Sequence, residues 1–187
     1  MKLRSVTLVC ILLSFLCLRA NAQGPRELAT SVSRRWHTYS DTIGYRVALP
    51  DFFKKGNLAR NRTSQYQPVD TNVTGIILFI SLVGNGNSDL LKKRYEQLAN
   101  ALTRQEDTKV EYKHLTKTSF VVSSVKIDDD EHDKNGNEQR YFWYARGMVA
   151  GKNVYEISIR YQPEYQKMIK KIIPKIAASF KEIASTE

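Results

Sequence analysis

The densest group of chemically active side chains is an acidic cluster in the second half of the chain. Six of the 19 Asp and Glu residues lie within residues 128–138, and with Lys134 as the only Lys or Arg this segment carries a formal charge of −5. Several carboxylate oxygens on a tight loop suit Ca²⁺, but the twelfth position of a calcium loop begun at Glu131 is Phe142, not the required Glu. The alternative is a solvated hairpin tip whose charges oppose edge-to-edge strand pairing. The solvated tip is favoured; the ligands predicted for the calcium alternative are Asp128, Asp130, Glu131 and Asp133.

A second group of charged side chains lies on a predicted C-terminal helix that begins at Pro163. On a 3.6-residue wheel its apolar and cationic residues fall on opposite arcs, which is typical of a helix docked on a core. The same pattern also suits a helix that lies on an anionic membrane surface. Docking is favoured because the predicted sheet otherwise lacks a cover. In either case the cationic arc can contact a partner, and the predicted partner-binding residues are Lys167, Lys170, Lys171 and Lys175.

The first 22 residues have the three-part pattern of a secretory signal peptide. Lys2 and Arg4 precede an apolar run over 6–18, and a small-x-small site ends at Ala22. The leader contains three basic residues, no acids and both cysteines, so cleavage after Ala22 lowers the formal charge from +10 to +7 and leaves no cysteine. The mature protein is therefore expected to be periplasmic or secreted and held together without disulfides. An uncleaved N-terminal anchor is the alternative.

Catalytic motifs are missing from the sequence. It has no Gly-x-Ser-x-Gly elbow, no His-Glu-x-x-His zinc motif and no phosphate-binding loop. The three histidines, His37, His114 and His132, are far apart along the chain. We therefore expect no catalytic residues, and no cofactor other than the Ca²⁺ considered above.

An aromatic run, Tyr141-Phe142-Trp143-Tyr144, lies on a predicted strand, so successive rings point to opposite faces. Aromatic and basic residues together occur in nucleic-acid sites. The predicted export and the lack of a recognisable binding motif exclude nucleic acid as the expected partner. We expect the rings to pack in the core on both faces, with a ligand groove lined by some of them as the alternative.

The elements that position these groups follow from periodicity. Residues 23–35 are a polar, flexible lead-in, and 36–187 form a single domain without an internal linker. Residues 54–72 are predicted to be a loop with a short edge strand near Gln65. Ser88 is the expected N-cap of the first helix. Together the elements form an antiparallel sheet with helices packed on it, an α+β fold. The predicted strands are 43–49, 75–83, 119–127, 139–149 and 153–161, and the predicted helices are 89–105 and the one that begins at Pro163.

This order of elements resembles the Mog1/PsbP-like superfamily. The similarity rests on the strand Ile43-Gly44-Tyr45-Arg46-Val47 followed by Pro50, on an amphipathic helix before a long hairpin, on a strand that ends in Arg160-Tyr161, and on Ser179-Phe180-Lys181 at the end of the last helix. The resemblance implies an α/β/α sandwich with a central antiparallel sheet. It also implies a non-enzymatic role, since similar proteins are mostly accessory subunits of membrane complexes, binding proteins or exported bacterial proteins. No partner-site residue of the family matches a position in this chain.

Taken together, the sequence predicts an exported, non-enzymatic interaction or accessory protein of the cell envelope. It would bind a protein partner in an envelope assembly, or an anionic membrane surface, through its oppositely charged regions. The alternative is a small-ligand or lipid-binding carrier with a groove between sheet and helix, and an enzyme built from scattered Asp, His and Ser residues is the least favoured. Asn61 and Asn72 begin glycosylation sequons, which are used only in a host that glycosylates exported proteins.

Overall fold

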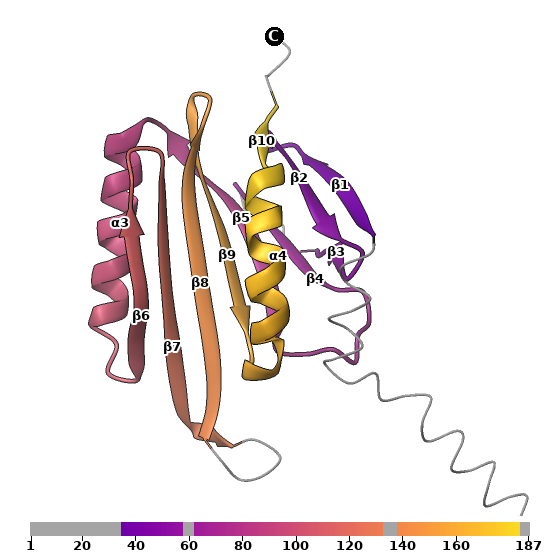
Figure 1. The fold of residues 1–187 in the computed structure, drawn as a ribbon, viewed down its shortest axis with the longest axis vertical. Helices are drawn as coiled ribbons and strands as arrows, with labels where there is room; N and C mark the ends of the chain where they lie inside the picture. Colours follow the sequence, from indigo (N-terminus) through magenta and orange to yellow (C-terminus); the bar gives the residue numbers. More distant parts are fainter. Residues whose placement is uncertain (1–34, 58–61, 133–137, 184–187) are drawn as a thin grey trace, which may run out of the picture.

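A seven-stranded antiparallel sheet forms the centre of the molecule (Figure 1). The computed structural model describes residues 35–57, 62–132 and 138–183, with the backbone alone for 128–132 and 138. The spatial order of the strands is β3-β4-β5-β9-β8-β7-β6, and each neighbouring pair is antiparallel. In chain order the strands are β3 Phe53–Lys55, β4 Thr63–Pro68, β5 Ile76–Asn85, β6 Thr108–Leu115, β7 Ser119–His132, β8 Glu138–Ala150 and β9 Asn153–Tyr161.

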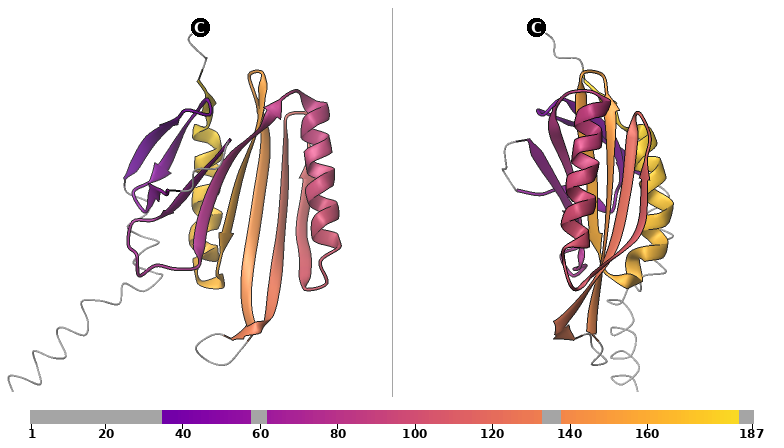
Figure 2. Two further views of the ribbon diagram at one scale, coloured as in Figure 1. Left: turned by 180° about the vertical axis from the view of Figure 1, so that it is seen from behind. Right: turned by 90° about the vertical axis from the view of Figure 1, so that its left-hand side faces the viewer.

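A three-stranded sheet and two helices complete the described fold. The small sheet has the order β1-β2-β10, with β1 Trp36–Asp41, β2 Tyr45–Pro50 and β10 Lys181–Glu182. The helices are α3 Ser88–Thr103 and α4 Gln166–Ser179, and a 3₁₀ turn, η1 Pro163–Tyr165, leads into α4. The two helices pack on opposite faces of the large sheet (Figure 2). The predicted α+β sandwich around an antiparallel sheet is therefore confirmed.

The C-terminal helix α4 buries its apolar arc, as the wheel predicted. Met168, Ile169, Ile172, Ile173 and Ile176 are all at most 6% exposed, and they belong to one core with strands β2, β5 and β9. Burying each such side chain stabilises the fold by about 1.5–3 kcal/mol. The apolar face of α4 is thus docked on the protein. In the described part of the chain, no helix combines the length and apolar character needed to cross a bilayer.

The other helix, α3, covers the opposite face of the sheet at its β6–β7–β8 half. Its N-cap is Asn87 rather than the predicted Ser88, because the Asn87 side chain accepts a hydrogen bond from the Asp89 backbone N–H at 2.9 Å. An ion pair fixes the helix to β9. Arg94 Nε donates to Glu156 Oε2 at 2.7 Å and Arg94 Nη2 to Glu156 Oε1 at 3.2 Å, while the Glu156 side chain is only 5% exposed.

A polar network joins the small sheet to the large one. The buried Asp41 carboxylate pairs with Lys55 Nζ at 2.6 Å and accepts from Ser64 Oγ at 2.6 Å. Burial alone would raise the pKa of Asp41, but the hydrogen bonds from Lys55, Ser64 and the Ile43 N–H and the charge of Lys55 hold that pKa below its ordinary value. Beside it the hydroxyls of Tyr45 and Tyr66 lie 2.8 Å apart. These contacts fix the angle between the two sheets.

Three parts of the chain differ from the sequence prediction. Residues 54–72 are more than a loop, because β3 ends within them and β4 is an interior strand between β3 and β5. Strands β1, β6 and β10 have no predicted counterpart, and Lys181, predicted at the end of the last helix, lies in β10. The sequence Gly84-Asn85-Gly86-Asn87 predicts a turn, but its first half extends β5, where Gly84 and Asn85 pair with Val154 and Asn153. The sequence Asn135-Gly136 predicts the turn of a hairpin between 119–127 and 139–149; that turn lies outside the described residues, but β7 and β8 pair with each other as expected.

Candidate functional site

Each helix covers only part of its own face of the large sheet, and on the α4 face β6, β7 and β8 are left without a helix. α3 packs on β6, β7 and β8 from one side, whereas α4 and the small sheet lie over the β5–β9 half on the other side. Burial along β7 shows the consequence directly. Phe120 and Val122, which face α3, are fully buried, whereas Val121 and Val125 between and beyond them are only half-buried. Figure 1 shows β6, β7 and β8 with no helix in front of them.

Strand register identifies the side chains on this uncovered surface, because directly paired residues on adjacent antiparallel strands share a face. Phe142 pairs with Tyr161, and Tyr144 pairs with Ile159, both of which belong to the core beneath α4. The same rows continue outward through β7 to β6. We call this surface the open face, and its central residues are Tyr112, His114, Val121, Ser123, Val125, Phe142, Tyr144 and Arg146.

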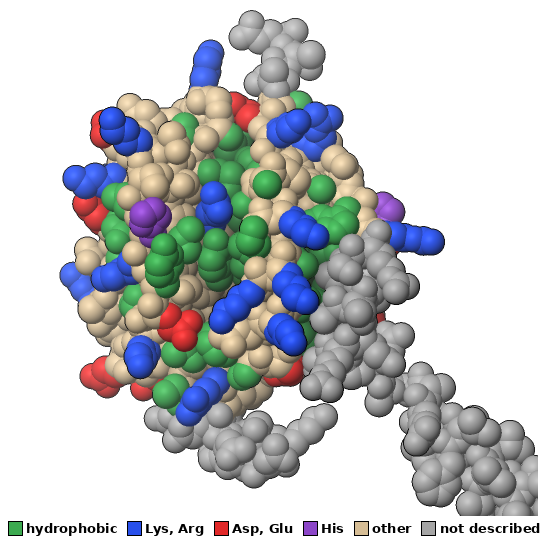
Figure 3. Space-filling view, viewed as in Figure 1, with side chains coloured by type: hydrophobic (Ala, Val, Ile, Leu, Met, Phe, Trp, Pro, Cys, Tyr) green, Lys and Arg blue, Asp and Glu red, His purple; other side chains and the backbone are tan. Residues whose placement is uncertain are grey.

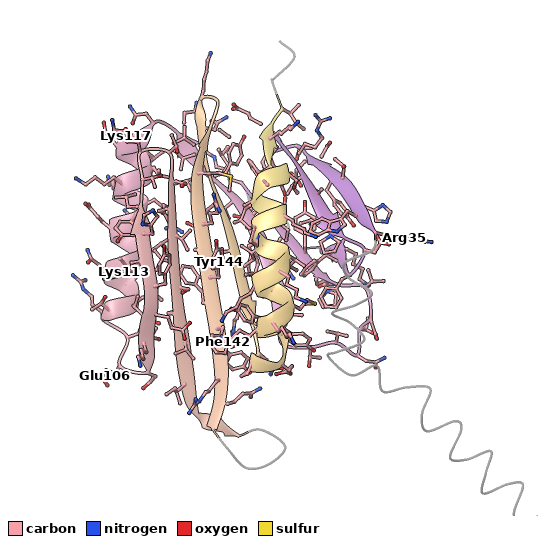
Figure 4. All side chains as sticks on the ribbon, viewed as in Figure 1. Arg35, Glu106, Lys113, Lys117, Phe142 and Tyr144 are labelled. Atoms are coloured by element: carbon pink, nitrogen blue, oxygen red, sulfur yellow. The ribbon has the colours of Figure 1, made fainter. Side chains whose placement is uncertain are left out.

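The open face is mainly apolar and aromatic. Phe142 stacks on Tyr161 with ring centroids 5.4 Å apart and an interplanar angle of 14°. Tyr112 on the edge strand is 53% exposed, an unusual value for an aromatic residue on a sheet. Figure 3 shows hydrophobic side chains gathered over β7 and β8, between α4 and β6, and Figure 4 labels Phe142 and Tyr144 on β8 beside α4. Contiguous exposed apolar surface of this kind marks interaction sites.

Basic groups outnumber acidic ones on the open face. By register it carries Lys109, Arg140 and Arg146, while Glu111 at the β6 bulge is the acidic residue close to it. Burial first, and then the nearby charge of Glu111, raise the pKa of Tyr161 to about 12. The open face is therefore an apolar surface with a positive balance of charge.

The four predicted partner-binding lysines lie together on α4. Lys167, Lys170, Lys171 and Lys175 are all exposed, on the arc opposite the buried isoleucines. Lys175 Nζ lies 6.0 Å from the centre of the Trp36 ring. In Figure 3 the basic side chains over α4 border the hydrophobic surface over β8. α4 thus lies beside the open face, with Lys175 turned toward Trp36 of the small sheet; the contact of the four lysines with a partner stays a prediction.

The predicted calcium ligands fall outside the part of the structure that can be described in atomic terms. The backbone of Asp128, Asp130 and Glu131 belongs to β7, but nothing is described of their side chains, and Asp133 lies outside the described residues. Among the side chains that the structure does describe, no three His, Cys, Asp or Glu residues gather as a metal site. The calcium site stays a prediction.

A shallow hollow of about 330 Å³ lies at the sheet edge, where the end of α3 meets the β6 bulge. Its lining includes Thr103 from α3 and Val110 and Tyr112 from β6. Tyr112 therefore borders both this hollow and the open face. The sequence analysis did not find either feature, because it did not predict β6; Val110 and Tyr112 alternate with polar neighbours, but this alternation ends at Lys113-His114 and is too short to predict a strand.

Comparisons with known proteins agree with this architecture. No protein-family model and no curated protein matches the sequence. Among solved structures, the Saccharomyces cerevisiae Ran-binding protein Mog1p has a TM-score of 0.58 at 10% identity, over 81% of this chain and 97% of that one. A variant of Mog1 gives 0.57 at 10% identity, over 81% and 98% of the two chains. The cyanobacterial PsbP protein of Synechocystis gives 0.51 at 12% identity, over 79% and 92%. Identities this low speak for the fold alone, and the chain has the Mog1/PsbP-like fold.

Proposed function

We propose that this protein is an exported, non-enzymatic accessory protein that binds a partner protein through the open face and the bordering lysines of α4. The observation that carries the proposal is the uncovered, half-buried aromatic and aliphatic surface of β6, β7 and β8. Protein interfaces are enriched in aromatic residues and Arg at their centres and are polar at their rims. The open face has this composition, with Tyr144 and Arg146 on β8, Tyr112 on the edge strand β6, and lysines on the adjacent helix α4.

Charge supports a partner with an acidic surface. The four exposed lysines of α4 and the basic residues of the open face form one positive region, which steers an acidic partner into position and raises its rate of association. A related fold is known to bind a protein, since the Saccharomyces Mog1p structure is that of a Ran-binding protein. A protein with this fold can thus bind another protein. The proposal for this chain itself rests on the residues of its own surface.

The carrier alternative needs a groove between the sheet and α4. That interface is instead filled by side chains, because Ile169, Ile176 and Ile159 are fully buried where the helix meets the sheet. The space in which an enclosed small ligand would lie is occupied by the core. The open face, by comparison, is broad and accessible, and such a surface is suited to contact with a macromolecular partner.

The experiment is affinity capture from an envelope extract of the native host, with matched pairs of variants. Tyr112→Ala and Val69→Ala remove side chains that are 53% and 51% exposed, but only Tyr112 lies on the open face. Lys170→Glu/Lys171→Glu and Lys92→Glu/Lys93→Glu each reverse two adjacent exposed lysines, on α4 and α3 respectively. We expect a protein that the wild type and both controls retain and that both test variants lose. Equal retention by the test and control variants would refute the proposed surface.

Export has its own test. We propose that the mature protein begins at Gln23, after cleavage at Ala22, and that it acts in the periplasm or outside the cell. N-terminal sequencing of protein recovered from the envelope fraction checks this. A blocked or intact Met1 on protein from that fraction would contradict cleavage and favour the anchor alternative.

A further inference from the structure

One cation lies in the middle of the open face, away from its rim. Arg146 on β8 pairs in register with Val121 on one side and Ile157 on the other, so its row is otherwise aliphatic up to the edge strand. The side chain as a whole is half-buried, and its Nε is a buried donor without a hydrogen-bond partner. A cation in such surroundings is costly unless something pairs with it.

Nothing in the described part of the molecule supplies that pairing in full. The guanidinium contacts the hydroxyl of Tyr144, and its charge opposes the rise that burial produces in the pKa of that tyrosine. No carboxylate among the described residues lies within 4.0 Å of Arg146. In contrast, the partly buried Arg94 on the other side of the sheet has a bidentate carboxylate partner in Glu156. The guanidinium of Arg94 thus has a carboxylate partner within the protein, whereas that of Arg146 has a hydroxyl partner and an Nε–H without one.

We propose that Arg146 is the anchor for a carboxylate of the partner, supplied by an Asp or Glu side chain with apolar neighbours. This inference rests on the proposed function and names the chemical group of the partner that the open face recognises. A guanidinium presents a planar fork of donors that matches the two oxygens of a carboxylate. The neighbouring side chains Val121 and Tyr144 offer contacts to apolar residues that flank the carboxylate. Charged pairs surrounded by apolar contacts that exclude water are typical of interface hot spots.

A fatty acid carries the same carboxylate, but the open face favours a protein. A long alkyl chain requires a cavity that encloses most of its surface. The nearest place for one is between α4 and the sheet, where buried isoleucines fill the space. The broad surface and the lysine rim match instead an acidic protein segment with apolar residues on both sides of its anchor.

The test uses three small probes and NMR of the mature protein, with detection of both backbone amides and the arginine Nε–H groups. The probes are N-acetyl-Leu-Glu-Phe-amide, the matched peptide with Gln in place of Glu, and dodecanoate below its micelle concentration. We expect the Glu peptide to shift the Arg146 Nε–H and the amides of β7 and β8, and to bind about tenfold more tightly than the Gln peptide, which is the effect of one charge-assisted hydrogen bond at a partly exposed site. Arg146→Lys should reduce that preference and Arg146→Met should abolish it.

Each other outcome overturns the inference. Equal binding of the Glu and Gln peptides at the open face would show that Arg146 does not recognise a carboxylate. The partner-binding role, which affinity capture tests, would then still stand. No shift with either peptide at millimolar concentration would also reject the anchor. Tighter binding of dodecanoate than of the Glu peptide would assign the site to a lipid. If Arg146→Met fails to fold, the comparison of the two peptides on the wild-type protein decides the question alone.

Discussion

The ion pair between Arg94 and Glu156 allows a quantitative test of how α3 is held on the sheet. The Glu156 side chain is 5% exposed and that of Arg94 is 33% exposed, so Arg94→Met leaves a buried carboxylate without its partner. Removing one member of a buried pair costs about 3–5 kcal/mol, and we expect the lower end because water reaches the guanidinium side. For a chain of this size, a loss of about 3 kcal/mol lowers Tm by roughly 6–12 °C.

The assay is urea unfolding of the mature protein, followed by far-UV circular dichroism, in a double-mutant cycle. Glu156→Leu alone should be destabilising, whereas Arg94→Met/Glu156→Leu should recover most of the loss, because no unpaired charge then remains. The control is Lys92→Met, which removes the exposed 4.0 Å pair with Glu96 on the same helix and should cost less than about 0.5 kcal/mol. If the two single changes simply add in the double variant, the pair does not hold α3 and the reasoning is wrong.

Three further predictions concern the core, the sheet junction and the acidic tip. A Cβ at Gly147 would lie 2.1 Å from Cε1 of the buried Phe120, so Gly147→Ala should cost about 1–3 kcal/mol in thermal melts, whereas Gly56→Ala, with its nearest atom at 3.5 Å, should be near neutral. The folded-state pKa of Asp41 lies below its ordinary value of 3.8, so its contribution to stability is present above that pH and is lost as the pH falls below it. The free energy of unfolding in urea should therefore differ less between pH 5 and pH 3 in Asp41→Asn than in the wild type. An unchanged difference would contradict this. At the acidic tip we expect the solvated alternative, in which Ca²⁺ titration gives neither calorimetric heat nor a change in Tm; either signal would establish the calcium site instead.

The long apolar elements were predictable from the sequence. β9, α3 and α4 each carry a hydrophobic period that specifies both the element and its buried face, whereas β5, β7 and β8 carry apolar residues on both faces and so indicate a strand without specifying which face is covered. The edge strand β6 was missed for a physical reason. A bulge between Val110 and Tyr112 shifts its alternation by one residue, and most of its side chains are exposed, so its strand geometry comes from pairing with β7 rather than from its own pattern. The short, polar β4 was underestimated in the same way, since its interior position depends on β3 and β5.

The candidate site was predictable only in part. The alternation of the aromatic run was correct, since Phe142 and Tyr144 share one face, while Trp143 lies with the core beneath α3. Periodicity says which rings share a face but not whether a helix covers it, because that depends on where η1 directs α4 after β9. Arg146 is one of 29 Lys and Arg residues, and no local pattern distinguishes it. Its significance comes from β7 and β6, which place it at the centre of an uncovered surface.

The open face follows from the arrangement of the layers. Each face of the seven-stranded sheet receives one helix. α3 packs mainly on β6, β7 and β8 and reaches β9 through the Arg94–Glu156 pair, while α4 and the small sheet cover the other half of the opposite face. The sheet is wider than one helix can cover, so an accessible half-face is a property of the architecture and requires no motif. The solved structures of this fold share only 10–12% identity with the chain, so the fold by itself does not say what this surface binds. The proposed function therefore rests on the side chains of the open face, among them Arg146 and Tyr112, and not on the fold.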